Sequence, residues 1–227
     1  MDYITRNFDV NLGFRVNTKM VLDATNDLNK FLASLPPSLY RNLDFKTTGA
    51  MIGALYCSYL ADRIEGAIVN PIEKGYPDII PESGANSTEE QLRNYPYGLE
   101  LKGTIGNVPK GAQLRGGEKR VNQLSGITWQ AHHQEVNKVM CIVWDFCNNI
   151  NGFNYPALTA AFYSDKLNHN DWGAISGTSG RNTKVCGMLQ SGKNKLGEGM
   201  ILLLNSKEYI SKYSRIMKLN ISQPSLF

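Results

Sequence analysis

Apolar residues recur at three- and four-residue steps over residues 17–35, which predicts an amphipathic helix that ends at Pro36-Pro37. A second helix is predicted to begin at a cap provided by Thr47 or Thr48 and to run to about Gly66. Its apolar positions are dense enough for a largely buried helix. The first part of the chain is therefore predicted to form two helices joined by a proline-containing turn.

The remaining hydrophobic pattern is typical of strands. Apolar and charged residues alternate from Tyr97 to Thr104, and 138–146 is almost entirely apolar, as in a central strand covered on both faces. Further strands are predicted at 158–163 and 200–204, with a short helix at 207–217 and mostly loop between 70 and 94. The chain is thus predicted to be one α/β domain spanning 1–227, with a mixed central β-sheet flanked by helices.

Composition supports a folded chain. Of 227 residues, 42% are hydrophobic and 19% are charged, which excludes disordered and fibrous classes. No apolar run approaches the length of a transmembrane helix, and the N-terminus lacks the pattern of a signal peptide, so we expect a cytoplasmic protein with no membrane partner. Four cysteines without a C-x-x-C pair are expected to be buried thiols rather than zinc ligands.

Charge is distributed unevenly along the chain. Residues 1–97 contain 9 Lys and Arg against 12 Asp and Glu, whereas 181–227 contain 8 against 2. This bias suggests a surface that faces a polyanion, although a soluble protein need not balance its charges locally. Charge alone does not decide between these interpretations.

The candidate chemistry lies in Pro77-Asp78 and Glu100-Leu101-Lys102. Side chains alternate along a strand, so Glu100 and Lys102 project together from one face while Leu101 points toward the core. If Asp78 begins a neighbouring strand, two carboxylates and one ammonium group converge. Two carboxylates can bind one or two Mg²⁺ ions, with the backbone carbonyl of Leu101 as a further ligand.

The same arrangement suits phosphodiester hydrolysis. A lysine beside the carboxylates can orient the attacking water and stabilise developing negative charge. The alternative is a turn aspartate after a proline and an ordinary strand that exposes a Glu/Lys pair. The apolar residues that frame Glu100 and Lys102, together with the basic segment that follows, favour the catalytic interpretation.

Pro77-Asp78 followed by Glu100-Leu101-Lys102 resembles the PD-(D/E)xK motif of type II restriction endonucleases. The resemblance implies a restriction-endonuclease-like core, Mg²⁺-dependent cleavage of double-stranded DNA at a palindromic site, and a homodimer; the overall impression is of blunt-cutting members. In this family a helical carboxylate often joins the metal site, a role that would fall to Glu65. The alternative for Glu65 is an exposed residue at the end of a helix.

Two basic, glycine-punctuated segments are candidates for DNA contacts. Glycines let a backbone approach phosphates, and Arg, Asn and Gln can reach base edges. The alternative is a pair of solvated loops. The candidate residues are Lys110, Gln113, Arg115, Lys119 and Arg120 in the first segment, a long exposed loop over 105–126, and Arg181, Asn182, Lys184, Gln190, Lys193 and Lys195 in the second, over 176–195.

Other features are less specific. His132 and His133 precede a predicted strand but lack a third ligand nearby, and Asp145 is better explained as a hydrogen-bonded structural residue. No phosphate-binding loop is present, so no nucleotide cofactor is implied. Besides a restriction enzyme, a repair or recombination nuclease of the same fold and a non-catalytic DNA-binding protein remain open, although no helix-turn-helix pattern is present.

Overall fold

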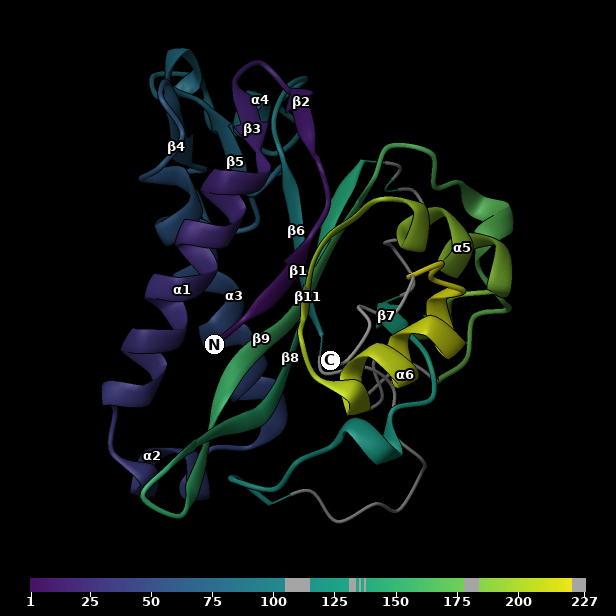
Figure 1. The fold of residues 1–227 in the computed structure, drawn as a ribbon. Helices are drawn as coiled ribbons and strands as arrows, with labels where there is room; N and C mark the ends of the chain where they lie inside the picture. Colours follow the sequence, from purple (N-terminus) through teal and green to yellow (C-terminus); the bar gives the residue numbers. More distant parts are fainter. Residues whose placement is uncertain (105–114, 131–133, 135, 137, 178–183, 222–227) are drawn as a thin grey trace.

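The computed structural model describes residues 1–104, 115–130, 134, 136, 138–177 and 184–221, and its centre is a five-stranded sheet (Figure 1). The strand order is β1-β11-β9-β8-β6. β6 runs parallel to β8, whereas the other neighbouring pairs are antiparallel. The strands are β1 (Tyr3–Thr5), β6 (Glu100–Thr104), β8 (Val139–Ile150), β9 (Phe153–Ser164) and β11 (Met200–Leu204). The predicted α/β class with a mixed central sheet is confirmed.

Helices cover both faces of this sheet. Helices α1 (Thr18–Ser34) and α3 (Phe45–Ala61) lie on one face, and α5 (Gln190–Glu198) and α6 (Lys207–Met217) lie on the other (Figure 1). The two faces accordingly bury two separate hydrophobic clusters. A small sheet of β7 (Thr128–Gln130) and β10 (Val185–Gly187) lies on the same side as α5 and α6.

The two N-terminal helices begin and end for local reasons. Asn17 caps α1 by accepting a hydrogen bond from the backbone N–H of Met20, and α1 ends before Pro36 as predicted. The second helix, α3, is capped by Asp44, which accepts from the Thr47 N–H at 2.6 Å, and not by Thr47 or Thr48. It also ends at Ala61 rather than near Gly66.

β8 and β9 form a long hairpin through the middle of the sheet. Residues 139–146 are buried in an unbroken run, so the prediction of a central strand covered on both faces is confirmed. The hairpin turns at Asn151-Gly152, where both residues have positive φ. The strands predicted near 158–163 and 200–204 and the helix at 207–217 are also present, as parts of β9, β11 and α6.

Short elements surround the N-terminal end of β6. Two hairpins lie there, in the upper part of Figure 1, together with the small helix α4. These elements are β2 (Asp9–Asn11), β3 (Arg15–Asn17), β4 (Ala67–Val69), β5 (Ile79–Pro81), the 3₁₀ turn η1 (Glu82–Gly84) and α4 (Glu89–Leu92). The remaining short elements lie elsewhere: α2 (Pro37–Asn42) follows α1, and the 3₁₀ turns η2 (Val121–Gln123) and η4 (His169–Asp171) come later in the chain.

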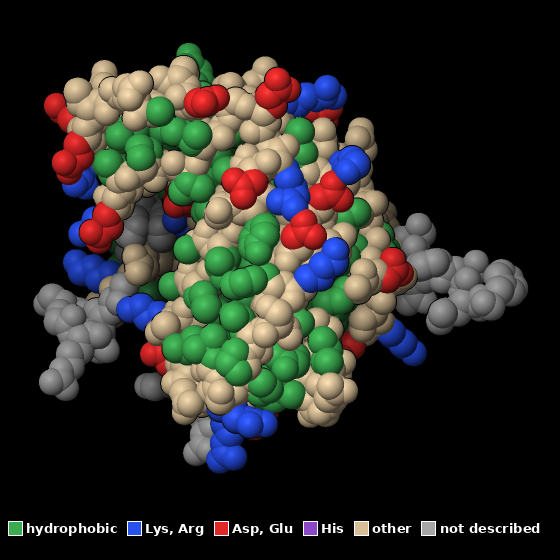
Figure 2. All heavy atoms as spheres, turned by 90° about the vertical axis from the view of Figure 1, so that its left-hand side faces the viewer, with side chains coloured by type: hydrophobic (Ala, Val, Ile, Leu, Met, Phe, Trp, Pro, Cys, Tyr) green, Lys and Arg blue, Asp and Glu red, His purple; other side chains and the backbone are tan. Residues whose placement is uncertain are grey.

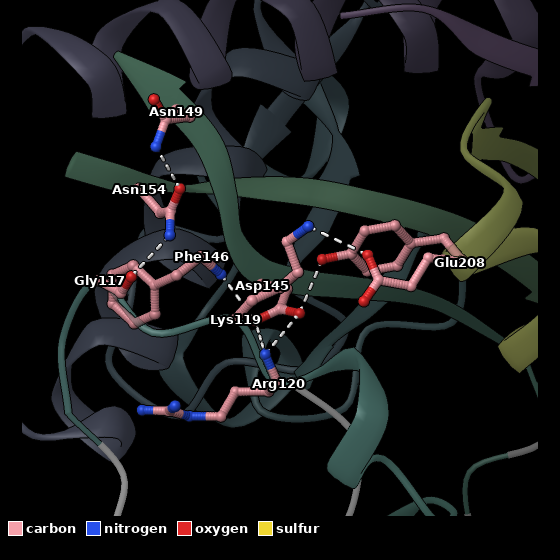
Figure 3. A network of polar contacts seen from close by, with 9 residues as sticks. Gly117, Lys119, Arg120, Asp145, Phe146, Asn149, Asn154 and Glu208 are labelled. Carbon is pink, nitrogen blue, oxygen red and sulfur yellow. Dashed lines mark hydrogen bonds and ion pairs between the residues drawn. The ribbon is translucent and has the colours of Figure 1, made fainter. Parts of the chain in front are cut away.

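The described part of 105–126 includes exposed residues, as predicted, but is anchored to the sheet and to α6. The backbone N–H of Arg120 donates to both carboxylate oxygens of Asp145, at 2.8 and 2.9 Å, and the Tyr209 hydroxyl donates to the same carboxylate at 2.8 Å (Figure 3). Lys119 pairs with Glu208 at 3.0 Å. These contacts fix residues 115–124 to β8 and α6, and Asp145 has the structural role expected of it.

The outer surface over α1 and α2 carries a group of hydrophobic side chains in the middle and lower part of Figure 2. Phe31 of α1 is 36% exposed.

Within the described residues, no helix is both long and apolar enough to span a bilayer.

Candidate active site

The candidate site lies on β6, which is the edge strand of the central sheet among the described strands. Leu99 and Leu101 point into the core, whereas Glu100 and Lys102 lie on the opposite face of the strand. The Glu100 side chain is 6% exposed and the Lys102 side chain is 19% exposed, and the two form an ion pair. The alternation predicted from the sequence therefore brings both groups to one side of a largely buried strand.

Asp78 joins this pair through strand pairing. It immediately precedes β5, and Ile79 pairs with Leu99 in the antiparallel sense through two backbone hydrogen bonds of 3.1 and 2.9 Å. This pairing places the Asp78 carboxylate beside β6, where its Oδ2 accepts a hydrogen bond from the Leu101 N–H at 2.7 Å. The structure thus brings Asp78, Glu100 and Lys102 together, although 22 residues separate the two carboxylates in sequence.

Asn70 holds the Asp78 segment in place. Its buried side-chain amide donates to the carbonyl oxygens of Pro77 at 3.1 Å and Leu92 at 2.9 Å, and its backbone N–H donates to the carbonyl of Asp78 at 2.8 Å. We infer no role for Asn70 from the sequence, because an asparagine before a proline is typical of any turn. The structure shows it to be a positioning residue for Asp78.

Burial dominates the electrostatics of Glu100. Desolvation raises the pKa of this carboxyl group from 4.5 to about 7; the Lys102 ammonium opposes the increase, and the nearby Asp78 charge adds to it. One oxygen, Oε2, is buried without a hydrogen-bond partner among the described residues. A buried carboxylate with an unused acceptor is unfavourable unless a cation or a proton joins it.

A cleft of about 710 Å³ opens beside Asp78 and Lys102. α3 contributes small residues to its wall, and the Gly49 carbonyl and the Gly53 Cα lie within 4 Å of the position that a Cβ on Gly103 would occupy. α3 and β6 therefore lie close together at this point, and a Cβ on Gly103 would make ordinary van der Waals contact with α3. Trp129 of β7 and Lys46 at the start of α3 also border the cleft.

Glu100 lines a second cleft, of about 560 Å³. Tyr76, Tyr97 and Lys138 line it together with Glu100. Burial raises the pKa of the Tyr76 phenol, and the charges of Glu100 and Asp78 raise it further. No sequence pattern distinguishes Lys138, and the one sequence signal for Tyr76 is its position two residues before Asp78.

The residues present fit a hard cation better than any other resident group. Asp78 and Glu100 supply carboxylate oxygens beside the Leu101 backbone. Oε2 of Glu100 has no hydrogen-bond partner among the described residues, so it could coordinate a cation. No group of three or more His, Cys, Asp and Glu side chains converges within the described ranges. Glu65 lies in an exposed turn after α3, lines neither cleft, and does not lie on a helix as was expected.

The predicted DNA contacts are divided by the structure. The prediction that Arg120 contacts DNA is wrong. Its side chain is fully buried, and its guanidinium lies 4.6 Å from the Phe45 ring centroid, so it does not face solvent. Lys195 pairs with the buried Asp171 at 2.7 Å. Outside the described residues lie Lys110, Gln113, Arg181, Asn182, His132 and His133.

The other predicted contacts lie at or near the surface. Arg115 and Lys184 are exposed, Lys193 is half-buried, and Lys119 keeps its ion pair with Glu208. Gln190 is the first residue of α5 and donates to Asn194 at 2.8 Å. The described part of the second basic segment therefore contains β10 and the first residues of α5.

No model of a protein family, no curated protein and no solved structure matches this chain significantly. The site itself therefore provides the basis for inferring the function.

Proposed function

We propose that the chain is a Mg²⁺-dependent endonuclease that cleaves double-stranded DNA at a specific palindromic site, with a restriction-endonuclease-like core. The observation that carries this proposal is the convergence of Asp78, Glu100 and Lys102 at the edge of the sheet, where Asp78 and Lys102 line one cleft and Glu100 lines the other. Two carboxylates and a lysine on a strand edge suit hydrolysis of a phosphodiester, whose reaction centre is anionic.

Asp78, Glu100 and the Leu101 carbonyl would hold the metal. When bound, Mg²⁺ polarises the scissile phosphate and lowers the pKa of a bound water. The Lys102 ammonium stabilises negative charge on the phosphate and orients the attacking water. Asn70 keeps Asp78 in register with β6, so the two carboxylates remain aligned before substrate binds.

Basic residues near the site support DNA as the substrate. Lys46 borders the cleft that holds Lys102, and Lys138 borders the cleft that holds Glu100. The residues predicted to contact DNA that are exposed, Arg115 and Lys184, can add contacts to phosphates or base edges. A nuclease that cuts both strands of a palindrome needs two such sites, so we propose a homodimer.

A plasmid digest with and without Mg²⁺ tests the proposal. Wild-type protein should give discrete fragments in Mg²⁺ and none in EDTA, and Asp78→Asn, Glu100→Gln and Lys102→Met should each lose cleavage by orders of magnitude. Glu89→Gln is the matched control, because it also removes a carboxylate from an ion pair, with Arg93, on the exposed surface of α4. Undiminished cleavage by any of the three site variants would exclude the assignment.

The products separate the alternatives. Smearing or a preference for branched DNA indicates a repair or recombination nuclease, and a gel shift without cutting indicates a DNA-binding protein. Sedimentation of the free and DNA-bound protein tests the homodimer, which would be excluded if the protein were monomeric in both states.

A further inference from the structure

The cleft that Glu100 lines is walled by aromatic side chains. Tyr76, Tyr95 and Tyr97 line it together with Glu100. The next two residues of the same strand, Leu101 and Lys102, line the other cleft with Asp78. The proposed metal and phosphate site at Asp78, Glu100 and Lys102 therefore borders both clefts.

Tyr97 is the most exposed large apolar side chain among the described residues, at 61%. Its position is nevertheless fixed. A Cβ on Gly13, in the turn between β2 and β3, would lie 3.0 Å from the Tyr97 Cβ, and a Cβ on Gly98 would lie 2.2 Å from the Ile79 carbonyl oxygen. Both glycines have positive φ, at +94° and +139°. An exposed ring on a fixed backbone is a surface available for stacking.

The other two tyrosines are also held by the backbone. The N–H of Tyr95 donates to the carbonyl of Tyr76 at 2.7 Å, and the N–H of Tyr76 donates to the carbonyl of Leu92 at 3.0 Å. The Tyr95 ring packs on Gly84, where a Cβ would lie 2.8 Å from its Cζ. The wall is thus formed before any ligand binds, which reduces the entropic cost of binding.

Polar groups complete the lining. Asn11 and Asn94 line the cleft, and the Asn11 side-chain oxygen accepts from the Gly13 N–H at 3.1 Å. Lys138, just before β8, adds a positive charge. Aromatic rings, amide groups and one ammonium in about 560 Å³ suit a planar heterocycle attached to a phosphate.

We propose that this cleft binds an unstacked nucleobase of the DNA strand whose phosphate lies at Asp78 and Lys102. The proposal rests on the proposed function, because the base is taken to belong to the strand that is cut. Stacking on Tyr97 supplies the attraction, and the amides of Asn11 and Asn94 contact the polar edge of the base. Alanine substitution of a stacking aromatic weakens binding about 5- to 150-fold per base.

A single-stranded thymidine oligonucleotide with one central 2-aminopurine tests this proposal, because its bases need no unpairing. Binding is measured in EDTA, so that no strand is cut, and is compared with the same strand carrying an abasic site at the central position. Wild-type protein should quench the 2-aminopurine fluorescence and bind the abasic strand at least five-fold more weakly. Tyr97→Ala should lose both effects, whereas Tyr97→Phe should keep them.

Phe31→Ala is the matched control, since it removes an exposed ring on α1, and it should behave as wild type. Equal affinity of wild-type protein for the two strands, or an unchanged base preference in Tyr97→Ala, would overturn the proposal even if the enzyme cleaves plasmid. The remaining outcome is that the protein cleaves no DNA in Mg²⁺ while the wild type still prefers the strand with the base and Tyr97→Ala does not. That result would support the base-binding cleft and exclude the proposed nuclease activity.

Discussion

Replacing Glu100 by glutamine should make the protein more stable at high pH. The pKa of Glu100 in the folded chain is raised from 4.5 to about 7, mainly by burial. The folded state therefore holds a proton that the unfolded chain releases, so stability falls as the pH rises from about 4.5 to about 7. Above that range the ionised carboxylate destabilises the folded chain, and glutamine removes this cost.

The magnitude follows from the two pKa values. A tenfold difference in proton affinity corresponds to about 1.4 kcal/mol, so full ionisation of Glu100 costs on the order of 3 kcal/mol. Glutamine also leaves Lys102, whose side chain is 19% exposed, without its ionic partner, which offsets part of the gain. We expect Glu100→Gln to be about 1–3 kcal/mol more stable than wild type at pH 8.

Urea unfolding of both proteins at pH 4 and pH 8 measures this effect. Groups distant from Glu100 contribute equally to the two proteins, so the difference between their stabilities reports Glu100 and the groups that its charge influences. That difference should be small at pH 4, where the unfolded chain also holds the proton, and should grow toward pH 8. A difference that is the same at both pH values would refute the reasoning about burial.

Three further predictions follow from individual contacts. Because the pKa of Glu100 is raised to about 7, Mg²⁺ binding should release a proton and weaken as the pH falls below about 7. Calorimetry in buffers of different ionisation enthalpy measures this release, and pH-independent binding would contradict metal binding at Glu100. Asn70→Ala should lower the unfolding free energy by about 1–3 kcal/mol, because it removes the side-chain donor to the carbonyl of Pro77 and one of the two donors to the carbonyl of Leu92. It should also slow cleavage, and a stable and fully active variant would remove its positioning role. Lys195→Ala should lower the melting temperature by removing the partner of buried Asp171, whereas the control Lys193→Ala should not; equal melting of the two variants would count against the ion pair.

The sequence predicted those parts of the fold whose signals are local. The alternation around Leu99–Lys102 and the apolar run of β8 were sufficient to predict two strands and the shared face of Glu100 and Lys102. The first three strands of the chain were missed because each has three residues, too few for a periodic pattern. The cap of α3 was misassigned because Asp44, Thr47 and Thr48 are all acceptable capping residues.

The site was harder to predict because its residues meet through contacts distant in sequence. The position of Asp78 depends on the pairing of Ile79 with Leu99, which no local pattern encodes. Arg120 looks like a surface residue among glycines and lysines, yet its partners Phe45 and Asp145 come from α3 and β8. Long-range partners thus decide which charged residues remain available to a ligand.

The pairing along the outer side of β6 has a consequence for solubility. A free sheet edge presents backbone N–H groups in every second position, which can pair with a strand of another molecule and start aggregation. Here the Leu99 N–H is bonded to Ile79, and the next N–H on that side, at Leu101, is bonded to the Asp78 carboxylate. Asp78 therefore shields the strand as well as serving the proposed chemistry. Asp78→Ala should aggregate more readily than Asp78→Asn, whose amide oxygen can still accept that bond.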